Sequence, residues 1–163
     1  ILVKRFEDFF REEGLDTSLG KAFNEAYQVR LGDTIVFCDD SKDLVTSLRG
    51  KVRQYVVSNG TVVAQTKKLR RSGFDKLMDG VFLSEELGYE KPAKEFFDLV
   101  FQEIHVPEKN RVLIVGDSLT SDIAGGNRAG IRTCWYNPGA QVNETGAKAD
   151  YEIRNLQEIW EII

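Results

Sequence analysis

Two aspartates spaced five residues apart follow an apolar segment in the C-terminal half of the chain. Residues 112–115 are Val-Leu-Ile-Val, Gly116 comes next, and Asp117 and Asp122 come after it. The apolar run predicts a buried parallel strand, and ligands bind at the carboxyl ends of such strands in open α/β sheets. Two carboxylates held together repel each other unless a cation lies between them, and their hard oxygen atoms favour Mg²⁺. The alternative is that both aspartates are turn and N-cap residues.

A hydroxyl, an amide and a glycine end a second apolar segment. Residues 55–57 are Tyr-Val-Val, and Ser58, Asn59 and Gly60 follow. Such a turn could direct a hydroxyl and successive backbone N–H groups at an anion, with the N-terminus of a helix behind them. An ordinary strand–turn–helix connection with Asn-Gly as the turn explains the same residues.

A lysine that directly precedes a proline forms the third segment. Pro92 is expected to open a helix as its first residue, which places Lys91 just ahead of that helix. From there Lys91 could reach an anion bound by the other two segments. A solvated surface lysine is the alternative interpretation.

Taken in this order, the three segments resemble the haloacid dehalogenase superfamily of phosphohydrolases. The matches to its second, third and fourth motifs are, in turn, Ser58, Lys91-Pro92, and Gly116-Asp117-Ser118 with Asp122. Residues 57–61, 84–88, 91–92 and 116–126 are similar, more narrowly, to the noncanonical pyrimidine nucleotidase branch of the bacterial 5′-nucleotidases. The resemblance extends over residues 44–163.

The resemblance implies a Mg²⁺-dependent phosphomonoester hydrolase that acts through an aspartyl-phosphate intermediate. Asp117 would bind the metal, Asp122 would bind it directly or through water, and Lys91 would neutralise the phosphoryl charge. Ser58 and the adjoining backbone N–H groups of Asn59 and Gly60 would bind the phosphate oxygens. Ser118 would be a neighbour of the metal ligands or simply a turn hydroxyl.

The implied substrate is a nucleoside 5′-monophosphate. Another small phosphate ester, such as a sugar phosphate, is the nearest alternative. A haloacid dehalogenase, a receiver-type signalling domain and a non-catalytic binding domain are the others. Aromatic residues such as Phe23 and Tyr27 could stack on a base, although aromatic residues in helices are more often part of a core.

The first motif of the family, Asp-x-Asp-x-Thr, has no match in this chain. That motif supplies the nucleophile and, two residues later, the general acid/base. Residues 35–40, Ile-Val-Phe-Cys-Asp-Asp, imitate it, but Ser41 and Lys42 stand where the second carboxylate is needed. We interpret this segment as the return from a cap; a degenerate motif and an unrelated use are the alternatives.

The family places its first strand in the middle of the sheet, between the strands of the second and fourth motifs. Without that strand, two buried edges would face each other with unpaired N–H and C=O groups. We therefore expect an upstream segment that carries the Asp-x-Asp pair and part of a helical cap. The chain alone is predicted to be inactive.

Alternating helical and strand patterns predict an α/β fold: a doubly wound, mainly parallel Rossmann-like sheet with a partial helical cap at the N-terminus. The cap is expected over residues 1–37 and the core over residues 38–163. Helices are expected over residues 1–13, 17–30, 42–49, 61–72, 93–104, 120–129 and 155–163. Strands are expected over residues 52–57, 80–83, 112–115, 131–135 and 151–153.

Composition agrees with a cytoplasmic enzyme that acts on a small molecule. The formal net charge is −4 over 163 residues, which argues against a nucleic-acid polymer as partner, and no apolar stretch is long enough to cross a membrane. Cys38 and Cys134 lie in apolar runs and are interpreted as reduced core thiols. His105 is expected to be a structural residue at a helix end. A monomer or a homodimer is expected.

Overall fold

The computed structural model describes residues 2–106 and 108–163. The chain divides into two compact units, one formed by residues up to 36 and residues 61–76, the other by residues 37–60 and 77–163. The division at residue 37 remains a prediction, because the first unit also contains residues 61–76. No helix of the described residues is long and apolar enough to span a membrane.

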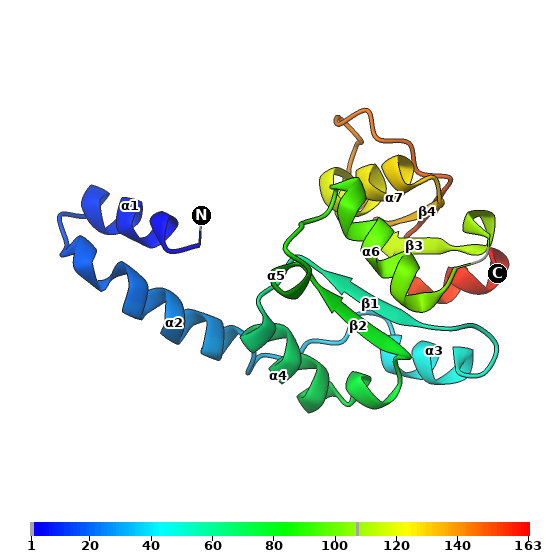
Figure 1. The fold of residues 1–163 in the computed structure, drawn as a ribbon, viewed down its shortest axis with the longest axis horizontal. Helices are drawn as coiled ribbons and strands as arrows, with labels where there is room; N and C mark the ends of the chain where they lie inside the picture. Colours follow the sequence, from blue (N-terminus) through cyan, green and yellow to red (C-terminus); the bar gives the residue numbers. More distant parts are fainter. Residues whose placement is uncertain (1, 107) are drawn as a thin grey trace. The chain divides into compact units, whose positions relative to one another are not determined.

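The first unit is helical (Figure 1). Its elements are α1 (Lys4–Glu12), the 3₁₀ turn η1 (Thr17–Leu19), α2 (Gly20–Leu31), α4 (Val62–Ser72) and the 3₁₀ turn η2 (Phe74–Lys76). Thr61 caps α4, because its hydroxyl accepts a hydrogen bond from the backbone N–H of Ala64 and donates one to Gln28. The helix predicted over residues 1–13 corresponds to α1, and the one predicted over 17–30 corresponds to η1 and α2, each with slightly shifted ends.

Aromatic side chains hold α1 and α2 together. The ring of Phe23 lies 5.0 Å from that of Phe6 and 5.4 Å from that of Phe10, and the Phe6 and Tyr27 rings are 5.5 Å apart. Offset and edge-on rings at these distances attract one another beyond their area burial. Phe23 and Tyr27 therefore contribute to the packing of the helical hairpin, as their helical spacing suggested.

The second unit is an α/β structure with two parallel sheets, which confirms the predicted fold class. Its strands are β1 (Tyr55–Ser58), β2 (Gly80–Leu83), β3 (Leu113–Gly116), β4 (Arg132–Tyr136) and β5 (Tyr151–Ile153). Its helices and turns are α3 (Ser41–Leu48), α5 (Ser84–Leu87), α6 (Lys94–Ile104), η3 (Lys109–Arg111), η4 (Leu119–Ile123), α7 (Ala124–Ala129) and η5 (Leu156–Glu161). One sheet has the order β1-β2 and the other β3-β4-β5.

Helices cover both faces of the three-stranded sheet, because successive strand residues point to opposite sides. Ile114 of β3 packs with Phe96 and Phe97 of α6. Cys134 of β4 packs on the other face with Leu44 of α3 and Ile159 of η5. The result is a helix–sheet–helix sandwich around β3 and β4.

Within residues 2–106 and 108–163, β1 and β3 each have a strand partner on one side only. Among the described residues β1 pairs only with β2, and β3 only with β4. A cavity of about 920 Å³ is lined by Tyr55 and Val57 of β1 and by Leu113 and Val115 of β3, among other residues. This is the arrangement expected of a sheet that lacks a strand between those two.

Several local predictions were wrong in detail. Pro92 does not open the helix: α6 begins at Lys94, after a turn in which Ala93 N–H donates to the Glu90 carbonyl. The segment expected as one helix over 120–129 begins with a π-helical turn, η4. The closing helix is the 3₁₀ turn η5. Cys38 is exposed and is not a core thiol, whereas Cys134 is buried.

Candidate active site

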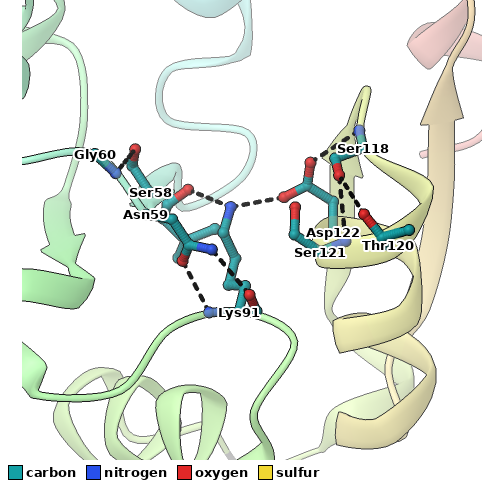
Figure 2. Close-up of polar contacts among 9 residues, drawn as sticks. Ser58, Asn59, Gly60, Lys91, Ser118, Thr120, Ser121 and Asp122 are labelled. Atoms are coloured by element: carbon teal, nitrogen blue, oxygen red, sulfur yellow. Dashed lines mark hydrogen bonds and ion pairs between the residues drawn. The ribbon is translucent and has the colours of Figure 1, made fainter. Parts of the chain in front are cut away.

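A buried ion pair links the ends of the two sheets. The ammonium group of Lys91 lies 2.6 Å from a carboxylate oxygen of Asp122 and donates a second hydrogen bond, 2.8 Å long, to the backbone carbonyl of Val57. Their side chains are only 7% and 10% exposed. Figure 2 shows Lys91 reaching between Asn59 and Asp122. Lys91 is therefore a buried, paired lysine and not the solvated one considered as an alternative.

The turn after β3 holds the carboxylate of Asp122 in place. Ser118 caps η4 by accepting from Ser121 N–H, and its own N–H donates to the second carboxylate oxygen of Asp122 at 3.2 Å. Gly116 makes room for this carboxylate: a Cβ at that position would lie 2.4 Å from the carboxylate carbon. Asp122 thus lies against the backbone on both sides of Asp117.

The turn after β1 is closed by its own hydrogen bonds. Gly60 N–H donates to the hydroxyl oxygen of Ser58 at 3.0 Å, so this donor faces Ser58 in the present conformation. The side-chain amide of Asn59 is bound at both ends to the backbone of Lys91: its NH₂ donates to the Lys91 carbonyl and its oxygen accepts from Lys91 N–H, each at 2.8 Å. Asn59 therefore contacts the loop that carries Lys91 (Figure 2), a role that residue type alone did not reveal.

Asp117 presents a free carboxylate at the same end of the sheet. The residue is exposed, and no hydrogen bond to its side chain occurs among residues 2–106 and 108–163. Its backbone carbonyl accepts a hydrogen bond from the indole N–H of Trp135 at 3.1 Å. Sequence reasoning missed Trp135, because a tryptophan in an apolar strand is ordinarily a core residue.

The oxygen-rich end of β3 fits a hard cation such as Mg²⁺. Asp117 supplies an exposed carboxylate directly after β3, and Asp122 a buried carboxylate that accepts from Ser118 N–H. No group of three acidic, histidine or cysteine side chains suited to a metal occurs in the described part of the chain. A metal here would need further oxygen ligands from water, substrate or another carboxylate.

One of the two acidic residues that resemble the first motif, Asp39, makes its hydrogen bonds to β4 and η5. The carboxylate of Asp39 accepts hydrogen bonds from the Tyr136 hydroxyl at 2.8 Å and from Leu156 N–H at 3.1 Å. Both Asp39 and Asp40 have positive φ, in the tight turn before α3. Asp39 therefore anchors the loop to β4 and η5, and the interpretation of residues 35–40 as the return from a cap stays a prediction.

A family model named haloacid dehalogenase-like hydrolase matches residues 2–130. The chain belongs to this hydrolase family. The expected resemblance is thereby confirmed over most of the chain, including all three recognised segments.

Several curated relatives match almost the whole chain. The chain is 37% identical over 163 residues to the HAD-hydrolase YfnB of Bacillus subtilis, covering 100% of this chain and 69% of that protein. It is 36% identical to the pyrimidine 5′-nucleotidase PynA of Streptococcus pneumoniae, covering 95% and 65%, and 31% identical to the pyrimidine 5′-nucleotidase YjjG of Escherichia coli, covering 98% and 69%. The chain thus spans about two thirds of the length of these relatives.

Solved structures share the fold. The magnesium-bound crystal structure of YfnB from Bacillus subtilis superimposes with a TM-score of 0.90 at 36% identity, over 99% of this chain and 70% of that one. A HAD phosphatase from Thermococcus onnurineus has a TM-score of 0.77 over 99% of this chain and 87% of its own. At 21% identity the second likeness bears on the fold alone.

Proposed function

We propose that this chain forms the core of a Mg²⁺-dependent phosphomonoesterase that hydrolyses pyrimidine nucleoside 5′-monophosphates through an aspartyl-phosphate intermediate. The observation that carries the proposal is the buried Lys91, held between the end of β1 and Asp122. A buried cation beside carboxylates at the carboxyl ends of parallel strands suits a phosphate dianion that approaches an acidic site.

Each residue of the site has a distinct task in this proposal. Lys91 neutralises charge on the transferred phosphoryl group, and Asn59 keeps the Lys91 backbone in place. The Ser58 hydroxyl and the backbone N–H groups of Asn59 and Gly60 bind the phosphoryl oxygens once Gly60 N–H turns from Ser58 to the ligand. Catalysis then consists of positioning and electrostatic stabilisation.

Asp117 and Asp122 would hold Mg²⁺, Asp117 directly and Asp122 directly or through water. When bound, the ion polarises the phosphoryl group and offsets the negative charge of an attacking carboxylate. The magnesium in the YfnB structure supports this assignment by analogy. The contacts of Asp122 with Lys91 and Ser118 would keep its carboxylate pointing at the metal position.

We place the nucleophile on an Asp-x-Asp segment, which has no match among these 163 residues. We propose that an apolar strand ending in Asp-x-Asp enters the cavity between β1 and β3 and pairs with both free edges. The first of its carboxylates would attack phosphorus, and the second would protonate the leaving oxygen and later activate water.

The choice of a pyrimidine nucleotide as substrate rests on the similarity to PynA and YjjG, which are pyrimidine 5′-nucleotidases. The test compares the 163-residue chain with a version extended upstream by a strand that ends in Asp-x-Asp. The extended protein should release phosphate from UMP and dTMP faster than from AMP or sugar phosphates, and EDTA should abolish this activity. The unextended chain should be inactive.

Asp117→Asn in the extended protein should lower kcat by about 10²–10³ or more, as for other preorganised electrostatic partners. Full activity of Asp117→Asn would contradict the metal assignment. A preference for sugar phosphates would support the phosphatase activity and overturn the assignment of a nucleotide as substrate. Metal-independent release of halide from a haloacid would instead make the protein a dehalogenase.

A further inference from the structure

Trp135 is a buried aromatic residue that contacts the backbone of Asp117. It lies in β4 opposite Gly116 in the parallel register, and only 5% of it is exposed. Its indole N–H donates to the Asp117 carbonyl at 3.1 Å. The contact thus joins β4 to Asp117, the first residue after the neighbouring strand β3.

The direction of the Asp117 side chain depends on this backbone. Its carboxylate has no hydrogen bond of its own within the described residues, so only the conformation of residues 116–118 orients it. Asp122 holds the N–H of Ser118 and packs against Gly116. Trp135 holds Asp117 itself, and it does so from a strand that is already fixed by pairing on both sides.

We propose that Trp135 is a positioning residue that aims the Asp117 carboxylate at the bound Mg²⁺. This proposal rests on the proposed function, because it needs a metal at Asp117. Groups that orient metal ligands through hydrogen bonds typically change metal affinity by about 10–100-fold when they are removed. Since Trp135 acts through a backbone carbonyl, we expect an effect of roughly tenfold, at the lower end of that range.

The chain contains a matched control. Trp160 is the other tryptophan; it lies in η5, and its ring is 4.5 Å from the ammonium of Lys51. Trp135→Phe removes the donor and keeps an aromatic ring, whereas Trp160→Phe makes the same chemical change elsewhere. Comparing the two separates the hydrogen bond to Asp117 from the general loss of an indole.

Metal affinity is measured without turnover. Free Mn²⁺ is followed by electron paramagnetic resonance during titration of the full chain, and Mg²⁺ is added as competitor. Trp135→Phe should weaken Mn²⁺ and Mg²⁺ binding about tenfold, while Trp160→Phe leaves both unchanged. Thermal unfolding checks that each variant is folded; if Trp135→Phe is not, 3-benzothienylalanine at position 135 keeps the ring shape without the N–H.

The possible failures are distinguishable. If the unmodified chain binds the metal in an Asp117-dependent way and folded Trp135→Phe binds it equally well, the positioning role is wrong and the proposed function survives. If Asp117→Asn binds Mn²⁺ as tightly as the unmodified chain does, Asp117 is no metal ligand. In that case both the positioning role and the metal assignment are overturned.

Discussion

Among single residues, Lys91 and Asp122 form the contact on which the site depends most. Breaking a buried ion pair by removing one partner leaves the other charge buried, which costs about 3–5 kcal/mol. We expect Lys91→Met to lower the free energy of unfolding by that amount in urea denaturation. The exposed pair Lys94–Asp98 is the control, and Lys94→Met should change stability by less than about 0.5 kcal/mol. Equal effects would show that the Lys91 pair is solvated.

A second prediction for a single residue concerns Gly116, which faces the carboxylate of Asp122. Gly116→Ala would place a methyl group 2.4 Å from that carboxylate carbon, so either the Asp122 side chain or β3 must move. We expect a loss of about 1–3 kcal/mol in stability, as for other overpacked sites. Gly139→Ala meets nothing closer than 3.8 Å and should be tolerated. Chemical denaturation of both variants is the measurement, and an unaffected Gly116→Ala would refute the close approach.

At the level of elements, Asp39 fastens the loop before α3 to β4. Its hydrogen bond with Tyr136 favours the neutral phenol and, together with burial, raises the pKa of Tyr136 to about 12. Below pH 10 this phenol is protonated in both the folded and the unfolded chain, so its stabilising contribution is complete. Between pH 10 and pH 12 the unfolded chain loses the proton first, so this contribution falls as pH rises.

Ultraviolet titration of tyrosinate checks this prediction. One tyrosine should ionise late, and Tyr136→Phe should remove that step. Asp39→Asn should move the step to lower pH, because it removes the negative charge and weakens the acceptor. Tyr89→Phe, which removes the hydroxyl of an exposed tyrosine, should leave the late step in place. A late step that survives Tyr136→Phe would assign it to another tyrosine.

The sequence predicts most elements because their patterns have local causes. Thr61 caps α4, and apolar runs form β3 and β4. That the ends of β1 and β3 lie near each other also follows from the sequence, since parallel strands end on the same side of a sheet. In the structure Lys91 joins these ends through Val57 and Asp122. Details set by distant contacts do not follow. The amide of Asn59 could equally have bound a ligand, and Cys38 is exposed although apolar residues precede it.

For the molecule as a whole, the reactivity of the two cysteines distinguishes the surface of the native protein from its core. Burial, and then the charge of Glu158, raises the pKa of the Cys134 thiol to about 11, and its side chain is fully buried in the core of the second unit. Only Cys38 should react with a disulfide reagent in the native protein. Cys134 should react only when the core opens, at a rate that rises with denaturant. In Cys38→Ser the fast reaction should disappear; a fast residual thiol would mean that Cys134 is accessible.

Two adjacent glycines in α7, Gly125 and Gly126, bear on how the site assembles. A Cβ at Gly125 would lie 2.6 Å from the Phe97 ring, and one at Gly126 would lie 2.5 Å from a methyl group of Thr133, so both positions need glycine for packing. Glycine costs a helix about 1 kcal/mol per residue relative to alanine, so η4 and α7 form a poor helix on their own. The segment that carries Asp122 therefore gains its order from α6 and β4. We expect its amide protons to exchange with solvent only when the surrounding core unfolds, so the site should form and be lost together with that core as one cooperative unit.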